Sequence, residues 1–425
     1  MRLGGLRASF DAEAFLGGLD PIGWRFGLER ISALLAALGE PQHEFESIHV
    51  VGTNGKSSVA VMTAALVEAS GRSTGCYLSP HSQRWSQRVR VRGSEVDPQA
   101  FAMAAARVAD AVPDVERGFA EGERITQFEA ATAVALVALA EAGVDVGVIE
   151  AGLGGRLDAT NVLRSSATVL TSIGLDHTAW LGETELEIAG EKLAVLREGS
   201  TLVLGQVSAP VAELARRVAA ERGCRVLSPG EEPGDGHLAA PYLRRNLAVS
   251  RAAAATVAPA LSDDALRGAL ATIRLPGRFE LIQGDPPLVM DAAHNPDGAR
   301  ALAEALAERA DGRPVVACLA ILADKDAEAF VSALAPALAA AVCTEIPAAR
   351  LQGAGRPGTS SVPAAELVRL CESAGVAATA HVDPAGATAL CRAMASERGG
   401  VALLAGSHYL LGYGWTAKHA QSSYT

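Results

Sequence analysis

His49-Val50-Val51-Gly52-Thr53-Asn54-Gly55-Lys56-Ser57-Ser58 is the stretch that decides the fold of this chain. The apolar run at residues 48–51 predicts a short buried strand, and the pattern over residues 56–70 predicts a helix. In such a strand–turn–helix unit, backbone N–H groups and the positive end of the helix dipole converge on one point, which suits a phosphate group. Lys56 adds a point charge for the β and γ oxygens of a nucleotide. The stretch therefore favours ATP or GTP binding over an ordinary turn.

The turn is a shortened form of the phosphate-binding loop. The strict pattern G-x-x-x-x-G-K-[ST] needs a glycine where this chain has Val50, so the chain reads G-x-x-G-K-S.

Strand and helix patterns alternate along two long regions around this stretch. Short apolar strands separated by helices are typical of parallel sheets covered on both faces. Adjacent Pro276 and Gly277 interrupt the alternation, which then restarts. We predict an α/β protein with an N-terminal P-loop-type parallel-sheet domain at residues 1–275 and a smaller C-terminal Rossmann-like domain at residues 276–425.

The individual elements follow from hydrophobic periodicity. The predicted strands are residues 48–51, 75–78, 144–149, 167–173, 201–204, 287–290, 315–320, 340–343, 376–382 and 401–405. The predicted helices are residues 56–70, 128–141, 183–196, 244–257, 263–271, 296–309, 327–338, 364–373 and 385–395. Residues 207–240 are predicted to be irregular.

Composition disfavours several classes of protein. The chain has 425 residues, 49% of them hydrophobic and 20% charged, as in globular proteins. A net charge of −11 and 4% aromatic residues argue against a nucleic-acid binder, which needs a basic face or stacking side chains. The six cysteines form no C-x-x-C pair and are expected to be reduced. The N-terminus lacks a signal-peptide core and residues 130–140 are too short to span a bilayer, so we expect a cytoplasmic protein without a membrane partner.

Two motifs place polar residues where strands of the first region end. Glu150 opens the glycine-rich stretch EAGLGGRLD, but Leu157 occupies the last glycine position of G-x-G-x-x-G, so nicotinamide binding is disfavoured. Glu150 is either a Mg²⁺ ligand at the strand end or a solvated carboxylate. His177, after the next predicted strand, is either a structural histidine or part of the same crevice.

A third motif lies in the second region, where Asp291, His294 and Asn295 follow a predicted strand. Asn295 before Pro296 is a typical helix cap. The alternative is a nucleotide site clamped between the two domains.

Taken in order, these motifs resemble those of the folylpolyglutamate synthase/dihydrofolate synthase family, a branch of the Mur-type amino-acid ligases. The resemblance covers nearly the whole chain, through FGLERISALLAALGEP, HVVGTNGKSSV, LSPH, TQFE, VIEAGLGGRLDATN, TSIGLDHT, EKLAVLREG, LPGRFE, DAAHNPDGA, ILADKD and GSHYLLG.

The resemblance implies a set of site residues. The ATP contacts would be Thr53, Asn54, Gly55, Lys56, Ser57, Asn246, Arg278 and Asp291. Ser79 and Glu150 would bind one Mg²⁺, and His177 would help to bind a second. Contacts on the pterin side would come from Thr126, Gln127, Phe128, Glu129, Leu157, Asp158 and Ala159. Lys56, Lys192, His177 and His294 would be catalytic, with Lys192 as a carbamate; without the resemblance, Lys192 reads as a helix-surface ion pair.

The resemblance also implies the reaction. A carboxylate of a folate or dihydropteroate attacks the γ-phosphate of ATP to give an acyl phosphate and ADP, and the amine of L-glutamate then displaces phosphate. Because the first two reactants are both negative, the rate depends on charge neutralisation by Mg²⁺ and Lys56. We expect a monomer that acts on small molecules.

The chain departs from the family pattern at three positions. Ser57 replaces a glycine that usually follows the lysine, and it places a hydroxyl there as in ordinary P-loops. Gln87 replaces a glutamate, so any carboxylate role at this position is absent. Arg25 stands where bifunctional relatives carry an acidic residue near the pterin, which favours chain extension over addition of the first glutamate.

Two other functions remain as alternatives. A cell-wall Mur ligase usually has a separate N-terminal domain for a uridine nucleotide, for which a phosphate loop that begins at residue 52 leaves no room. A P-loop switch without turnover is disfavoured by the two separate candidate Mg²⁺ ligand sets and by the Asp291/His294 pair.

Overall fold

The chain folds into two compact units, each built around its own sheet. A computed structural model describes residues 10–20, 27–81, 84–230, 238, 240–259, 261–353 and 359–415. Unit 1 comprises Met1–Glu232 and Arg245–Ile273, and unit 2 comprises Pro233–Arg244 and Arg274–Thr425. The predicted boundary after residue 275 lies two residues beyond the end of unit 1, while residues 233–244 group with unit 2. Arg25 lies outside the described residues.

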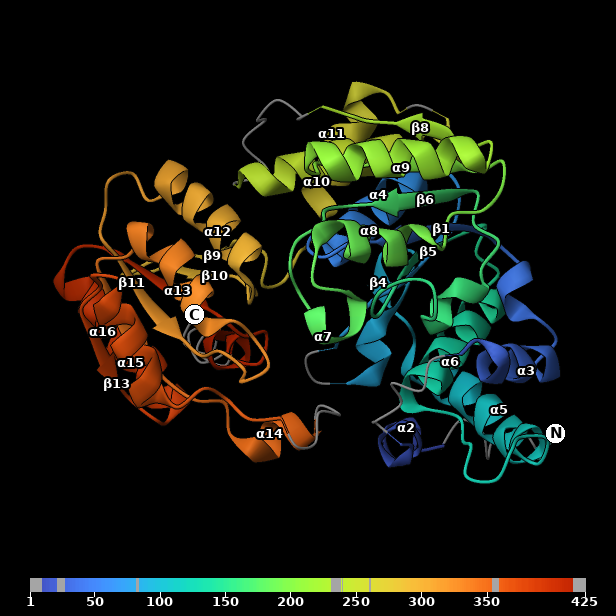
Figure 1. The fold of residues 1–425 in the computed structure, drawn as a ribbon, viewed down its shortest axis with the longest axis horizontal. Coiled ribbons are helices and arrows are strands. Elements are labelled where there is room, and N and C mark those ends of the chain that lie inside the picture. Colours follow the sequence, from blue (N-terminus) through green and yellow to red (C-terminus); the bar gives the residue numbers. More distant parts are fainter. Residues whose placement is uncertain are drawn as a thin grey trace. The chain divides into compact units, whose positions relative to one another are not determined.

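Unit 1 contains an eight-stranded sheet in the order β4-β3-β2-β5-β1-β6-β7-β8 (Figure 1). The strands are β1 Glu46–Val51, β2 Thr74–Tyr77, β3 Val89–Val91, β4 Ser94–Glu95, β5 Val146–Glu150, β6 Ala167–Leu170, β7 Thr201–Leu204 and β8 Arg225–Leu227. The neighbouring strands β2, β5, β1, β6, β7 and β8 pair in parallel, in this order. Strands β3 and β4 extend the sheet beyond β2 with antiparallel pairings. The carboxyl ends of β2, β5, β1 and β6 therefore lie at one edge of the sheet, where α/β proteins bind their ligands.

Helices cover both faces of this sheet. The helices of this part of the chain are α2 Ala12–Gly18, α3 Glu29–Ala37, α4 Lys56–Ala69, α5 Pro98–Glu116, α6 Gln127–Glu141, α7 Thr178–Leu181, α8 Glu185–Leu193, α9 Ala209–Glu221, α10 Pro241–Ala254 and α11 Asp263–Thr272, with 3-10 turns η1 Pro41–His43, η2 Trp85–Arg88 and η3 Ala159–Val162. The alanine-rich α6 packs with Tyr77 and Ile149 in one core, to which no residue of α4 belongs. Because α4 contacts β1, β2 and β5, it covers the opposite face.

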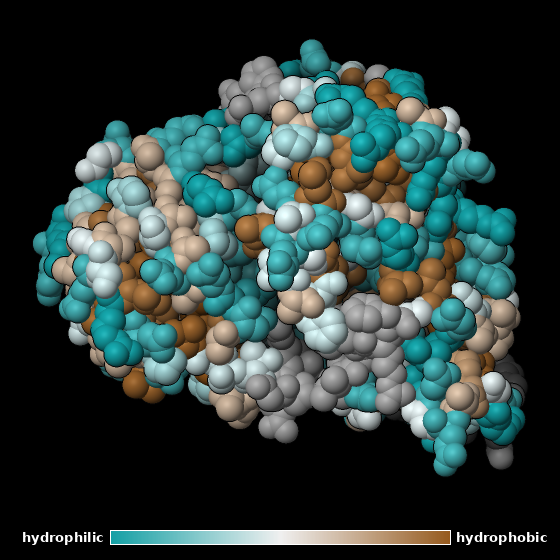
Figure 2. All heavy atoms as spheres, viewed as in Figure 1, coloured by the Kyte–Doolittle hydropathy of each residue, from teal (hydrophilic) through white to brown (hydrophobic). Residues whose placement is uncertain are grey.

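Unit 2 contains a six-stranded sheet in the order β13-β12-β11-β14-β10-β9. The strands are β9 Glu280–Ile282, β10 Leu288–Met290, β11 Val315–Leu319, β12 Ala340–Cys343, β13 Ala378–Ala380 and β14 Val401–Ala405, and only β9 is antiparallel. The helices are α12 Pro296–Arg309, α13 Ala327–Leu334, α14 Ala348–Gly353, α15 Ala364–Ser373 and α16 Pro384–Glu397, with the turn η4 Ala335–Ala337. The predicted α/β class with parallel sheets is confirmed. Figure 2 shows hydrophilic residues over much of the visible face, with smaller hydrophobic areas between them.

The prediction that residues 207–240 are irregular is wrong, because α9 and β8 lie there. Only Val211, Ala215 and Ala219 of α9 are buried, so two of its three core positions are alanines that give a weak periodic signal. Strand β8 has three residues and a partly exposed edge position, which leaves little pattern to detect.

Candidate functional site

The loop between β1 and α4 brings backbone close to its neighbours. Gly52 has a φ of 149°, and a Cβ there would overlap Thr171 Oγ1. Gly55 has a φ of 84° and precedes α4 without a side-chain cap. Both positions need glycine. The first N–H groups of α4 have no acceptor within the helix. They lie next to Gly55, which has no side chain that could cover them.

Lys56 is held against the same loop. Its Nζ donates to Gly52 O at 3.0 Å and to Thr53 O at 3.1 Å. The ammonium group therefore lies over the turn that precedes α4, the position in which a phosphate-binding lysine acts.

The chain after β6 fixes the phosphate loop from the neighbouring strand. Thr53 N donates to Ser172 O at 2.8 Å, and Asn54 N donates to Ser172 Oγ at 3.0 Å. Thr171 Oγ1 donates to Asn54 O at 2.6 Å. Sequence reasoning missed Thr171 and Ser172, because the predicted strand at residues 167–173 included them, whereas β6 ends at Leu170.

Glu150 connects three elements at the carboxyl edge of the sheet. Its side chain is buried at the end of β5, and Ser57 Oγ donates to its Oε1 at 3.0 Å. The backbone N–H of Ser79, just after β2, donates to its Oε2 at 3.1 Å. The structure thus brings together Ser57, Ser79 and Glu150, which the sequence placed in three separate motifs.

Lys192 is buried near the end of α8, with 3% of its surface exposed. Its pKa is lowered from the ordinary 10.5 to about 7, mainly by burial and also by the charge of Lys56, while Asp176 and Asp158 oppose the shift. The alternative of a helix-surface ion pair is therefore wrong for this residue.

His177 stands beside Asp176 in a left-handed backbone conformation, with a φ of 52°. Its N–H donates to Asp176 Oδ1 at 2.9 Å, and its side chain is 29% exposed. The charge of Asp176 raises the pKa of Lys192, and the charge of Lys56 lowers it. His177 therefore lies beside a group of charged residues that interact with one another.

The residues assigned to the pterin side have structural contacts of their own. Thr126 and Glu129 form the capping box of α6, and Glu129 makes a buried ion pair with Arg30 at 3.0 Å. Gln127 Nε2 donates to Leu16 O at 3.0 Å, and Phe128 packs so closely on Gly152 that a Cβ there would overlap its ring.

The last of these residues flank the glycine-rich loop. Leu157 is 41% exposed, whereas Ala159 is buried. Asp158 is also buried, and its oxygens accept from Leu153 N at 2.7 Å and from Thr160 N at 3.0 Å. Its carboxylate therefore shapes the loop at residues 152–158.

A buried histidine supports this loop from β1 and was missed from the sequence. His49 Nε2 lies 2.8 Å from Thr160 Oγ1, which donates to Asp158 Oδ1 at 2.5 Å. Burial, with a smaller effect of Arg197, lowers the pKa of His49 to about 3, so it is neutral. The alternation of β1 predicts only an apolar strand, and nothing in the pattern marks His49.

Asn246 on α10 lies against the phosphate loop, since a Cβ on Gly55 would stand 2.9 Å from its Oδ1. Ser250 secures this helix through a 3.3 Å hydrogen bond to Val59 O of α4.

The remaining predicted residues lie in unit 2. Asp291 is buried after β10, and its oxygens accept from Phe279 N and Ala293 N, both at 2.8 Å, and from Tyr242 Oη at 2.5 Å. His294 Nδ1 lies 2.9 Å from Ala292 O, and Arg278 precedes Phe279 in the same loops. Asn295 caps α12, which confirms the helix-cap prediction; its Oδ1 accepts a hydrogen bond from Gly298 N at 2.9 Å.

The oxygen donors in unit 1 fit a hard cation. In the described part of the chain, no group of three or more His, Cys, Asp or Glu side chains could hold a metal ion. A Mg²⁺ that binds with a nucleotide needs fewer protein ligands, since phosphate oxygens and waters complete its shell. Glu150 with the serines that contact it supplies such a partial set.

Comparison with known proteins identifies relatives for both units. Residues 277–408 match the model of the Mur ligase, glutamate ligase domain. The dihydrofolate synthase/folylpolyglutamate synthase of Mycobacterium tuberculosis is 34% identical over 395 residues, which cover 80% of each chain.

Solved structures agree over almost the full length. Mycobacterium tuberculosis folylpolyglutamate synthase complexed with ADP and AMPPCP superposes with a TM-score of 0.84 at 29% identity, covering 92% of this chain and 95% of the other. The bifunctional folylpolyglutamate synthase/dihydrofolate synthase of Yersinia pestis, complexed with AMPPNP and Mn ion, gives 0.82 at 29% identity, covering 97% and 99%.

Within the described ranges, none of the helices combines the length and apolar character needed to cross a bilayer. The order of motifs, the loop geometry and the match over four fifths of a relative's length lead to one conclusion. The chain belongs to the folylpolyglutamate synthase/dihydrofolate synthase family of Mur-type ligases.

Proposed function

We propose that the chain is an ATP-dependent carbon–nitrogen ligase that adds L-glutamate to folates through an acyl phosphate. The observation that carries the proposal is the cluster in unit 1 where Lys56, Glu150 and Lys192 surround one end of the sheet. The relatives of Mycobacterium tuberculosis and Yersinia pestis carry this activity in their names and bind ADP, AMPPCP or AMPPNP.

In this proposal, the loop at residues 53–57 binds the ATP phosphates. Lys56 is already positioned by Gly52 O and Thr53 O, so little side-chain entropy is lost when phosphate oxygens replace part of these contacts. Its charge offsets the charge that builds up as a folate carboxylate oxygen attacks the γ-phosphorus and ADP leaves. The amine of glutamate then attacks the acyl carbon, and phosphate leaves with the former carboxylate oxygen.

We propose that Ser79 and Glu150 hold one Mg²⁺ and that His177 helps to hold a second. Bound Mg²⁺ would neutralise phosphate charge in this reaction. The support is the short contacts of Glu150 to Ser57 and Ser79, and the Yersinia pestis relative was solved with a Mn ion.

We also propose that Lys192 carries a carbamate. Attack of an amine on CO₂ requires the neutral form, and a pKa of about 7 provides it near neutral pH. The product is an anion that would lie in the neighbourhood of the cationic Lys56.

The substrate is proposed to be a folate, with dihydropteroate as a second acceptor for the first glutamate. The support is that Phe128 packs on Gly152 and that Asp158 accepts a hydrogen bond from Leu153 N, so both predicted pterin-side groups have a residue at the glycine-rich loop. Mass spectrometry after incubation with dihydropteroate, ATP and glutamate tests the first coupling, and an unchanged dihydropteroate would restrict the enzyme to chain extension.

We propose that the enzyme acts as a monomer in the cytoplasm, where ATP is supplied and its six free cysteines stay reduced. Light scattering of the purified chain tests the monomer.

ADP release is the direct test of the ligase. It should need both a folate and L-glutamate, and release at the same rate without either substrate would point to a simple ATPase.

A further inference from the structure

A buried imidazole stands in the middle of the unit 1 sheet. His49 belongs to β1, which pairs with β5 on one side and β6 on the other, and none of its surface is exposed. Its neighbours in the strand, Ile48 and Val50, are buried apolar residues. Burying a polar side chain costs free energy unless a hydrogen bond compensates it. The packing of β1 does not need an imidazole, so the hydrogen bond that His49 makes is the feature to explain.

The hydrogen-bond directions at His49 follow from its neighbours. Its pKa of about 3 makes the ring neutral, so only one ring nitrogen carries a proton. Thr160 Oγ1 donates its single proton to Asp158 Oδ1 at 2.5 Å, so it can only accept from the ring. We therefore assign the proton of His49 to Nε2, which lies 2.8 Å from Thr160 Oγ1. The three side chains form a series of hydrogen bonds in which each bond strengthens the next.

This series ends on the carboxylate that holds the glycine-rich loop at residues 152–158. Asp158 Oδ2 accepts from Leu153 N at 2.7 Å, and Oδ1 accepts from Thr160 N at 3.0 Å. Burial raises the pKa of Asp158, and the hydrogen bond from the Thr160 hydroxyl is the largest effect that opposes the rise. The charged carboxylate that bridges the two ends of the loop thus depends on this hydroxyl, which His49 orients.

The far end of the loop has a separate anchor. Arg197 Nη2 donates to Asn161 Oδ1 at 2.7 Å, and Asn161 Nδ2 donates to Arg156 O at 2.8 Å. These contacts tie residues 156–161 to the segment after α8, whereas the start of the loop is held by Asp158.

We propose that His49 is a positioning residue, which acts through Thr160 and Asp158 to hold the glycine-rich loop in the conformation that receives the folate. The inference rests on the proposed function, in which residues 157–159 lie on the pterin side. His49 has no exposed surface with which to touch a substrate. A loop that is already ordered loses less conformational entropy on binding. Without this support, only the fraction of molecules with an ordered loop binds the folate, and the apparent affinity falls by that fraction.

A general structural role is the alternative, because β1 runs directly into the phosphate loop at Gly52. Loss of packing in this strand would disturb ATP binding at least as much as folate binding. Steady-state ADP release with varied folate and varied ATP therefore separates the two roles.

His49→Phe keeps a planar ring of similar size and removes the donor. We expect its KM for the folate to rise about fivefold or more, as a buried hydrogen bond is lost, while its KM for ATP stays within about twofold. His49→Gln can still place an amide N–H near Thr160, so its KM for the folate should lie between those of the parent and His49→Phe.

Thr168→Val is the matched control. Thr168 is the register partner of His49 on β6 and is equally buried, and its Oγ1 has no hydrogen-bond partner in the described part of the chain. Removing this hydroxyl changes the same region of the core without touching the series, so both KM values should match those of the parent.

Two further measurements test the route through Thr160. The double variant His49→Phe/Thr160→Val should raise the KM for the folate no further than Thr160→Val alone, since both changes break one series. Amide hydrogen exchange measures the loop without any substrate: in His49→Phe, the amides of Leu153 and Thr160 should exchange faster than in the parent, and those of the phosphate loop should not.

An unchanged KM for the folate in folded His49→Phe would overturn the proposal, as would an equal rise in the KM for ATP, additive effects in the double variant, or unchanged amide exchange in the loop. If ADP release by the parent does not depend on a folate, the proposed function fails and the role in folate binding fails with it. Amide exchange then still decides whether His49 holds the loop.

Discussion

At the scale of single residues, Lys192 shows how burial prepares an amine for chemistry. Its pKa of about 7 arises mainly from desolvation, and the ammonium of Lys56 adds repulsion. From the sequence, Lys192 could be either a carbamate or a helix-surface ion pair. Its burial depends on how α8 packs on the sheet, and no local sequence pattern predicts this packing.

The stability of the protein should depend on Lys192 in a defined pH range. The folded pKa lies below the ordinary value of 10.5, so between about pH 7 and 10.5 the unfolded chain binds more protons and stability rises with pH. Lys192→Met removes the buried amine, and its melting temperature should exceed that of the parent most clearly below pH 7. The difference should shrink as the pH rises toward 10; a difference that grows with pH would show that burial of the amine is not the cause.

The carbamate makes a separate prediction for activity. Below about pH 7 a growing share of Lys192 is protonated, so the rate should fall and added bicarbonate should restore part of it. Lys192→Ala should be slow at every pH and insensitive to bicarbonate, with partial rescue by small carboxylates. A parent enzyme that ignores bicarbonate in CO₂-depleted buffer would exclude the carbamate.

Lys56→Ala should abolish ATP turnover and leave the fold intact, since its hydrogen bonds are to loop carbonyls that water can also satisfy. Loss of a group that stabilises transition-state charge costs about 10²–10³ in rate. Arg216→Ala, on the exposed face of α9, is the control. Parent-like ADP release by Lys56→Ala would remove the phosphate role from this lysine.

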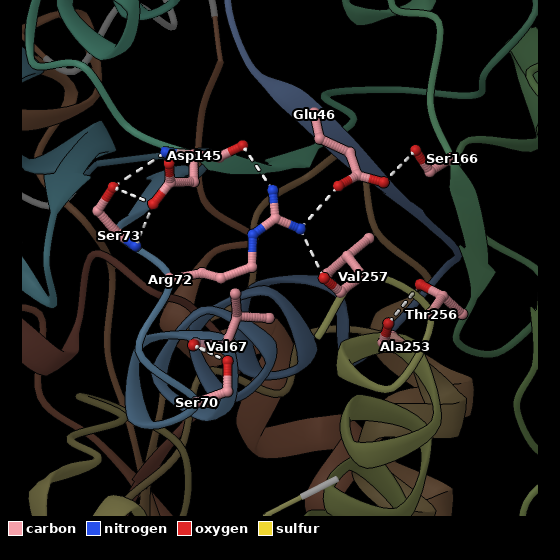
Figure 3. A network of polar contacts seen from close by, with 10 residues as sticks. All are labelled: Glu46, Val67, Ser70, Arg72, Ser73, Asp145, Ser166, Ala253, Thr256 and Val257. Atoms are coloured by element: carbon pink, nitrogen blue, oxygen red, sulfur yellow. Dashed lines mark hydrogen bonds and ion pairs between the residues drawn. The ribbon is translucent and has the colours of Figure 1, made fainter. Parts of the chain in front are cut away.

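At the scale of secondary-structure elements, α10 is the helix whose anchoring matters most, because it carries Asn246 against the phosphate loop. Figure 3 shows how Arg72 fixes the chain after this helix. Its Nη1 donates to Glu46 Oε2 at 2.7 Å and to Val257 O at 2.5 Å, and Ser166 Oγ donates to Glu46 Oε1 at 2.7 Å. The start of β1 and the end of α10 are thereby held together.

Arg72→Ala should lower the free energy of unfolding by about 1–3 kcal/mol, because the partly buried Glu46 loses its ion pair and keeps only the hydrogen bond from Ser166, while Val257 O loses its donor. The KM for ATP should rise as well, since α10 loses one of its anchors and keeps the hydrogen bond from Ser250 to Val59 O. Arg117→Ala, which removes an ion pair that is 72% exposed on both sides, should change neither quantity measurably. Urea denaturation measures the free energy of unfolding, and ADP-release kinetics measure the KM for ATP. If both quantities are the same in Arg72→Ala and Arg117→Ala, Arg72 does not anchor α10.

Several elements with strong caps or apolar runs were predicted, although α5, which begins after the Asp97 cap, was not. Helix α12 begins at Pro296 after the Asn295 cap and ends at Arg309, as predicted, and β12 and β14 also match. Helix α9 was missed because its buried stripe is mostly alanine, and the antiparallel edge of β3 and β4 has only three and two residues.

At the scale of the whole molecule, the candidate site exists because parallel strands end together. The sequence correctly predicted that Glu150 and the phosphate loop follow strands of one sheet. The strand order β2-β5-β1-β6 then puts Ser79, Glu150, Lys56 and Thr171 along a single edge. That order depends on long-range pairing between strands about 100 residues apart, which no local pattern encodes.

The central claim is that a folate carboxylate is activated by phosphorylation and then captured by glutamate. Incubation of the enzyme with ATP, L-glutamate and a folate labelled with ¹⁸O in its reacting carboxylate tests this directly. The label should appear in the released inorganic phosphate, together with a product heavier by one glutamyl residue. Glutamylated product with unlabelled phosphate, or labelled folate returned unchanged while ATP is consumed, would contradict the account.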